Sequence, residues 1–318
     1  KEWIDNQSIV ATSPDEITDA RTLAAKIAML KAIKEYDLKR LISFHSSVLG
    51  AKKFSEELVD LVNMIEPDNR PQGTFFSDYV SGNMKASDRK EKIEKLKTLN
   101  GSNRGILSNA RCLAEGVDVP SLDGVAFIDP KGSEIDIIQA VGRAIRKVRE
   151  AKVQTKGTII IPVFIEEADD HETSIAASNF KPVWEVLKAL RAHDALLAEN
   201  LDQYRTNMGR GTSGNGGTFS HKVIFDIPKT VGAEFASALR TVLVEASTSS
   251  WEFWFGLLEK FKETYGHCLI AQRDKFNNYS LGSWVNNIRF KKSNLSPKQI
   301  AELDALGFDW DPKETDWL

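Results

Sequence analysis

Four residues near the middle of the sequence have the types and spacing needed to hold an anion: Gln139, Gly142, Arg143 and Arg146. Residues three and four positions apart share one face of a helix, so Gln139, Arg143 and Arg146 are expected to point the same way. Gly142 lets a ligand approach the backbone closely. Two converging guanidinium groups repel each other unless an anion lies between them, and polyphosphate suits their planar donors. The alternative is a pair of surface arginines on an ordinary amphipathic helix.

The helix that carries these arginines must be positioned by a loop and strands, and the sequence supplies both. Residues 106–120 read Ile-Leu-Ser-Asn-Ala-Arg-Cys-Leu-Ala-Glu-Gly-Val-Asp-Val-Pro, and an apolar run ending at Asp129 follows. This pattern predicts a strand, a polar loop with Gly116 and Asp118, a second strand and then the helix. In a parallel sheet, such loops and helix starts present side chains to a ligand.

Strands and helices alternate over residues 20–165, which predicts an α/β domain with a parallel sheet. We expect helices at residues 20–36, 51–64 and 86–99, and strands at residues 38–46, 74–80 and 157–165. The polar stretches at residues 43–47 and 108–120 then fall at the carboxyl ends of strands, where such sheets bind ligands. For His45 and Ser46 a second interpretation stays open, because serine is a favoured N-cap for the following helix.

The order and spacing of these segments resemble the second motor lobe of superfamily 2 helicases, which include DEAD-box and DEAH-box proteins. The stretch from Ser108 to Pro120 is similar to motif V of that family, and the stretch from Gln139 to Arg146 is similar to motif VI. The resemblance implies a RecA-like α/β fold with flanking helices. Gln139 stands where DEAD-box proteins have a histidine, which favours the DEAH, restriction-enzyme-like or DNA-translocating branches.

The same resemblance implies a role for each matching position. Arg143 and Arg146 would be arginine fingers that reach the γ-phosphate of ATP, a role worth roughly three to five decades in rate, with Gln139 beside them in the catalytic set. Gly116, Asp118 and Gly142 would face the nucleotide. The positions that would contact nucleic acid are Ser43, His45, Ser46, Ser108, Asn109 and Arg111.

Two parts of a complete ATPase are not found in the sequence. There is no G-x-x-x-x-G-K-[ST] phosphate loop and no Asp-Glu pair at the end of an apolar strand to hold Mg²⁺. We therefore expect ATP and Mg²⁺ to be cofactors of a longer protein, whose N-terminal RecA-like lobe is the partner of this chain. Residues 1–19 are interpreted as a linker from that lobe, and residues 20–170 as the C-terminal lobe.

The region after residue 170 has a different character. Residues 171–246 are interpreted as a helical connector, with one long helix at 180–204, a flexible glycine-rich loop at 209–217, a short strand at 222–227 and a helix at 231–245. Residues 247–318 carry Trp251, Leu-Gly-Ser-Trp at 281–284 and Leu-Gly-Phe-Asp-Trp at 306–310. These positions resemble the all-α helicase-associated domain that follows superfamily 2 motors in bacteria. Most of its aromatic residues are expected to form the core of a small domain.

A group of basic residues in this last region is a second candidate for binding nucleic acid. Its members are Arg273, Lys275, Arg289, Lys291, Lys292 and Lys298, of which Arg289, Lys291 and Lys292 are selected as contacts. Phe276 or Tyr279 would be available for stacking on a base. The alternative is an ordinary solvated face.

Composition limits the remaining possibilities. The length of 318 residues suits about two domains, and a net charge of −3 means that nucleic acid must be bound through local clusters. No apolar run approaches the ~20 residues that span a bilayer, so no membrane partner is expected. Cys112 and Cys268 are expected to be free thiols in the cytoplasm, with no metal site.

The sequence thus predicts the C-terminal part of an ATP-dependent helicase or translocase, acting on DNA rather than RNA. The alternative is a non-enzymatic module that binds nucleic acid or docks a partner and carries a vestigial motor lobe. Converging arginines favour the first hypothesis, since a vestigial lobe has no physical need for them.

Overall fold

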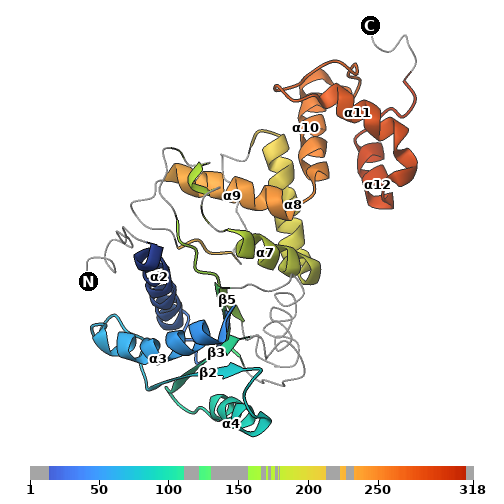
Figure 1. Cartoon of the computed structure of the whole chain (residues 1–318). Coiled ribbons are helices and arrows are strands. Elements are labelled where there is room, and N and C mark those ends of the chain that lie inside the picture. The colour runs from blue at the N-terminus through green and yellow to red at the C-terminus, as the bar shows by residue number, and fades with distance from the viewer. Residues whose placement is uncertain are drawn as a thin grey trace. The chain divides into compact units, whose positions relative to one another are not determined.

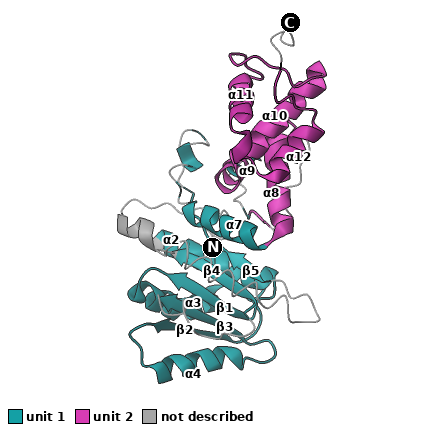
Figure 2. Cartoon of the chain, turned by 90° about the vertical axis from the view of Figure 1, so that its right-hand side faces the viewer, with its two compact units in different colours: residues 1–193, 226–239 teal, residues 194–225, 240–318 magenta. Residues whose placement is uncertain are grey.

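The computed structural model describes residues 14–110, 122–129, 157–165, 170, 173–175, 178, 180–212, 223–226 and 233–312. The chain divides into two compact units (Figure 2). The first comprises residues 1–193 and 226–239, and the second comprises residues 194–225 and 240–318.

The first unit is built on a five-stranded sheet of order β2-β3-β1-β4-β5 in which every described pair is parallel (Figure 1). The strands are β1 (Arg40–His45), β2 (Phe75–Ser81), β3 (Arg104–Ala110), β4 (Gly124–Asp129) and β5 (Thr158–Ile160). The predicted parallel α/β domain is therefore confirmed. The expected strand at 157–165 is wrong in length, because only three of its residues pair, and Pro162 has no N–H with which to extend a ladder.

Successive residues of each strand pack into two different cores, as the two-residue period of a strand requires. Leu41, Ile106 and Ala126 face α2 (Pro14–Glu35) and α3 (Val48–Met64), whose core residues include Met29, Phe54 and Leu58. Ile42, Leu107 and Val125 form the other core with α4 (Ala86–Lys97) and α7 (Lys181–His193), which contribute Ile93, Leu96 and Val186. The three predicted helices at 20–36, 51–64 and 86–99 are confirmed within a few residues.

Buried polar contacts tie together the amino ends of the strands. The Arg104 guanidinium donates to Gln72 O at 2.6 Å, Leu38 O at 2.5 Å and the Asp37 carboxylate at 2.6 Å. Asp123 Oδ2 accepts from the backbone N–H groups of Lys39 and Arg40 at 2.9 and 3.0 Å. These charge-assisted hydrogen bonds fix the amino ends of the strands relative to one another.

The second unit is helical. Its elements are α8 (Ala195–Gly209), part of α9 (Ala233–Ser247), α10 (Ser250–Tyr265), α11 (Leu281–Phe290), the 3₁₀ turn η2 (Lys292–Asn294) and α12 (Pro297–Ala305). The expected single helix at 180–204 is wrong, because Asp194 interrupts it. The Asp194 side chain accepts from Leu197 N at 3.1 Å and caps a new helix, α8. The expected strand at 222–227 is also wrong over residues 223–226, which form no strand.

Two glycines allow α8 and α10 to touch backbone to backbone. A Cβ added to Gly256 would lie 2.1 Å from Thr206 O, and one added to Gly209 would lie 2.0 Å from Phe253 O. These distances are far below van der Waals contact, so only glycine fits at either position.

Aromatic residues form much of the remaining core of this unit, as the sequence predicts. Phe308 is buried, and Trp251, Trp284 and Trp310 are partly buried against the core. The indole N–H groups of Trp251 and Trp310 donate to Glu302 and Asp304 at 3.2 and 2.7 Å, which satisfies them where the rings pack. Over the described residues, no helix is long and apolar enough to cross a membrane.

Candidate functional site

The register of β1 and β3 places the polar stretch at residues 43–47 beside the start of the stretch at residues 108–120. Ser43 lies opposite Ser108, and the Ser43 hydroxyl donates to Ser108 Oγ at 3.1 Å. Ser43 Oγ is also 3.0 Å from His45 Nε2. A neutral imidazole nitrogen can donate to a hydroxyl or accept from it, so either tautomer of His45 completes this contact. Three side chains from two strands thus form one hydrogen-bonded chain.

This chain of side chains lies inside the protein. Ser43 and Ser108 have 0% of their surface exposed, and Asn109 has 2%. The His45 ring packs on Phe54 of α3, with a centroid distance of 4.8 Å. Neither serine hydroxyl is available to a phosphate in this structure, so the geometry gives no support to direct contact with nucleic acid. Their hydrogen bonds instead fix the carboxyl ends of β1 and β3 relative to each other.

Ser46 and Ser47 form the surface part of the polar stretch at residues 43–47. Ser47 is the N-cap of α3, and its hydroxyl accepts from Gly50 N at 3.0 Å. The capping interpretation is therefore confirmed for the serine next to the predicted pair. Ser46, which is partly exposed, lies where the chain leaves the sheet, and its contact with nucleic acid stays a prediction.

His45 lies at the carboxyl end of β1, next to the strand ends from which the segments similar to motifs V and VI follow. The strand register places it opposite Ala110, the last residue of β3, and opposite Asp129, the last residue of β4. The segments that begin at residues 111 and 130 thus start from the two strands on either side of β1. The predicted residues that they carry all lie outside the described residues: Arg111, Gly116, Asp118, Gln139, Gly142, Arg143 and Arg146.

The three basic residues selected in the second unit have different environments. Arg289 Nε donates to Asp309 O at 2.9 Å, and its guanidinium lies 5.2 Å from the centre of the Phe308 ring. Burial lowers the pKa of Arg289 from its ordinary value. Lys292 Nζ lies 4.2 Å from the centre of the Trp310 ring, and Lys291 is exposed. Arg289 therefore stabilises the fold, and nucleic-acid contact by all three residues stays a prediction.

Comparison with known families agrees with this division of the chain. Residues 26–148 match the family described as "Helicase conserved C-terminal domain", and residues 248–311 match the "Helicase associated domain". The chain contains a helicase C-terminal domain followed by a helicase-associated domain. The predicted superfamily 2 resemblance and its RecA-like fold are thereby confirmed.

Two solved structures give the wider context. The chain aligns with "ATP-dependent Type ISP restriction-modification enzyme LlaBIII bound to DNA" with a TM-score of 0.55 and 19% identity, covering 93% of this chain and 22% of that one. It thus shares a fold with about a fifth of that enzyme. "Mss116p DEAD-box helicase domain 2 bound to an RNA duplex" aligns at 16% identity over 92% of this chain and 84% of that one, with a TM-score of 0.33, too low to indicate a common fold. None of the curated proteins compared matches the sequence.

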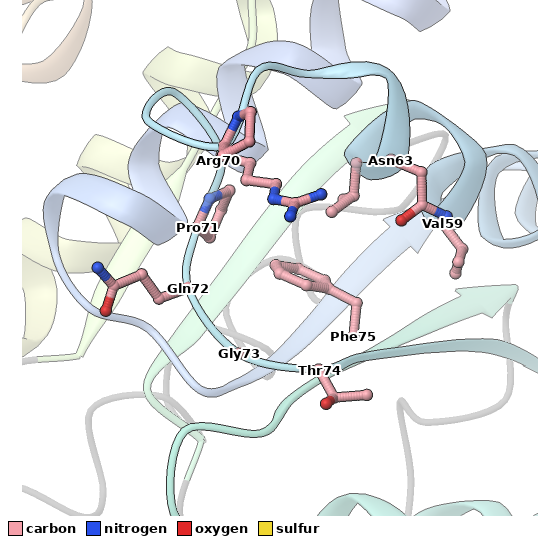
Figure 3. Close-up of a pocket in the computed structure, with 10 residues that line it drawn as sticks. Val59, Asn63, Arg70, Pro71, Gln72, Gly73, Thr74 and Phe75 are labelled. Carbon is pink, nitrogen blue, oxygen red and sulfur yellow. The ribbon is translucent and has the colours of Figure 1, made fainter.

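A cavity of about 490 Å³ lies beside the amino end of β2 in the helicase lobe (Figure 3). Its lining includes Val59 and Asn63 from α3, Arg70, and Phe75 at the start of β2. Figure 3 shows the Arg70 guanidinium and the Phe75 ring facing the cavity. Because it adjoins the amino end of β2, this cavity is separate from the carboxyl edge that carries His45. Among the described residues, no group of His, Cys, Asp and Glu side chains could hold a metal ion.

Proposed function

We propose that this chain is the C-terminal part of an ATP-dependent DNA helicase or translocase. Its ATPase site would be completed by an N-terminal RecA-like lobe of the same protein. The observation that carries the proposal is the helicase C-terminal domain over residues 26–148, because that match spans the Ser43–Ser108 pair and the Gln139–Arg146 segment in order. The Type ISP enzyme with the same fold is bound to DNA, which supports DNA as the nucleic acid.

The nucleotide side of the proposal involves residues that follow β3 and β4. In parallel α/β sheets, ligands bind beyond the carboxyl ends of the strands. The strands on both sides of His45 end at that edge, and this fits a nucleotide site assembled from the segments that follow them. Gly116, Asp118 and Gly142 would face the nucleotide, and Gln139, Arg143 and Arg146 would bind and orient its γ-phosphate. ATP would supply the phosphoanhydride bond, and the ligands of Mg²⁺ would come from the other lobe.

The nucleic-acid side would begin at Ser46, where β1 leaves the sheet. The buried Ser108–Ser43–His45 chain would hold this edge in one shape, so that a change in the segments after β3 and β4 is transmitted to Ser46. Ser43 and Ser108 are thus proposed as positioning residues for the nucleic-acid track.

The test is DNA-stimulated ATP hydrolysis by the full-length protein that contains this chain. Arg143→Ala and Arg146→Ala should each lower the turnover number by roughly 10³ to 10⁵. Arg70→Ala is the matched control, because Arg70 is an arginine at the opposite edge of the same sheet, and it should leave turnover unchanged. Unchanged hydrolysis in both motif variants, or no ATPase activity in the wild type, would favour the non-enzymatic alternative.

A further inference from the structure

The loop between α10 and α11 contains a two-residue hairpin turn in a defined conformation. Phe276 and Tyr279 exchange both backbone N–H to O hydrogen bonds, each 2.9 Å long. Between them, Asn277 and Asn278 have φ angles of 49° and 66°. Left-handed backbone at both central positions is the signature of a type I′ turn, which asparagine tolerates better than most residues. Both asparagine side chains are exposed at the turn.

Aromatic contacts hold both sides of this turn. The Phe276 ring meets Phe261 edge to face, with centroids 5.4 Å apart at an interplanar angle of 88°. The Tyr279 ring meets Phe253 with centroids 4.9 Å apart at 69°. Both rings therefore support the turn from α10. Phe276 is partly buried, whereas Tyr279 keeps 46% of its surface exposed, so stacking of an aromatic ring on a base stays a prediction.

The base of the loop is fixed by the start of α11. Gly282 N donates to Asp274 O at 3.2 Å, and a Cβ added to Gly282 would lie 1.9 Å from Ala271 O. The loop backbone therefore packs directly on the helix. A loop held in this way loses little conformational entropy when it binds a ligand.

The loop also lies in a basic part of the chain. Residues 269–298 contain six Lys and Arg side chains and a single acidic one, Asp274, although the whole chain has a net charge of −3. Arg273 and Lys275 are exposed, and within the described part of the chain no carboxylate forms an ion pair with either. Lys260 and Lys298, by contrast, are paired with Glu263 and Glu302 at 2.8 and 3.6 Å. Unpaired cations beside exposed amides suit a ligand that carries both phosphates and hydrogen-bonding edges.

We propose that the turn at Asn277 and Asn278 enters a groove of duplex DNA, with both amides at base edges and Arg273 and Lys275 on the adjoining phosphates. Asparagine amides both donate and accept, which matches base edges, and Arg and Lys bind phosphate oxygens. A duplex is favoured over a single strand because the tip of the turn presents two exposed amides and no aromatic ring, while the Phe276 ring packs on Phe261. This inference rests on the proposed function, since it assigns the helicase-associated domain its contact with the same DNA.

The experiment measures the affinity of the 318-residue chain for a fluorescent 20-base-pair duplex and for one of its strands, at several salt concentrations. One variant is Arg273→Gln with Lys275→Gln. The second is Asn277→Gly with Asn278→Gly, in which glycine keeps the left-handed backbone while removing the amides. The charge control is Lys97→Gln with Lys260→Gln, because both lysines are ion-paired elsewhere in the fold. Circular dichroism verifies that each variant is folded.

The wild type should bind the duplex more tightly than the single strand. Loss of two phosphate contacts should reduce the slope of log affinity against log salt by about 1.8, at ~0.9 for each contact on duplex DNA. The glycine variant should bind the duplex on the order of tenfold more weakly with its salt slope unchanged. The charge control should bind as the wild type does.

Three outcomes would overturn the inference: equal binding by the glycine variant, loss of affinity in the charge control as large as in the Arg273/Lys275 variant, or preference for the single strand. Equal binding would mean that the asparagines only shape the turn. If the wild type binds neither DNA, the inference and the DNA part of the proposed function both fail. The ATPase test of Arg143 and Arg146 is independent of these results, so the two failures can be told apart.

Discussion

Replacing Ser43 by alanine tests whether the buried serine pair holds the carboxyl edge of the helicase sheet. The Ser43 hydroxyl has two partners, Ser108 Oγ at 3.1 Å and His45 Nε2 at 3.0 Å, and both serines are fully buried. A net value of about 1 kcal/mol for each hydrogen bond gives a loss of about 2 kcal/mol in the free energy of unfolding. Ser108→Ala removes one bond and should cost about 1 kcal/mol.

The double variant provides the sharper result. Ser43→Ala with Ser108→Ala loses the same two bonds as Ser43→Ala alone, so its cost should be about 1 kcal/mol less than the sum of the two single costs. Urea dependence of hydrogen exchange at the amides of β1 and β3 measures this cost in the first unit alone, which avoids assuming that both units unfold together. Ser55→Ala is the control, because its buried hydroxyl bonds within α3 to Lys52 O at 2.8 Å, and it should be additive with Ser108→Ala. A cost below ~0.5 kcal/mol for Ser43→Ala, or full additivity in the double variant, would refute the reasoning.

Three further predictions concern other parts of the chain. Gly256→Ala should destabilise the second unit in thermal or urea unfolding, because the new Cβ would lie 2.1 Å from Thr206 O. The clash should cost about 1–3 kcal/mol, from which ~1 kcal/mol gained in helix propensity is subtracted. A stability equal to that of the wild type would contradict the close contact of α8 and α10. The hydrogen bond from Arg104 lowers the pKa of Asp37, so the stability that this bond contributes is complete above about pH 4 and is lost as the pH falls further. Asp37→Asn should therefore lose less stability than the wild type on acidification. An acid profile equal to that of the wild type would count against the contact. Burial raises the pKa of the Cys268 thiol, so alkylation of Cys268 at pH 8 should be slow in the folded chain and fast in urea; peptide mass spectrometry separates it from Cys112, and rapid labelling of Cys268 in the folded chain would show that its thiol is not buried.

The arrangement of the helicase lobe follows closely from its sequence, and the exceptions have local causes. Leu41 and Ile42 belong to opposite cores, as strand alternation requires, and this signal is available without a structure. The strand at 157–165 stops early although its residues are apolar and β-branched, because Pro162 cannot extend the ladder. The break between α7 and α8 is hidden by apolar periodicity that continues through it. The signal that could have found it is Asp194, a favoured N-cap.

The environments of the candidate site residues were less predictable. Ser43 and Ser108 are polar positions near strand ends, which the sequence alone cannot distinguish from exposed loop residues. Their mutual hydrogen bond depends on the register between two strands that are 65 positions apart in sequence. In the same way, the basic spacing around Arg289 gives no sign that its side chain is held by Asp309 O and Phe308. Tertiary contacts decide these cases, and the sequence specifies them only through the whole fold.

We propose that the helicase C-terminal domain acts as half of a motor that moves along DNA. The most direct measurement is displacement of a fluorescent third strand from a DNA triplex by the full-length protein, with and without ATP. We expect ATP-dependent displacement by the wild type and by Arg70→Ala, and loss of displacement in Arg146→Ala at equal DNA binding. Absence of displacement by a wild type that binds DNA, or full displacement by Arg146→Ala, would contradict it.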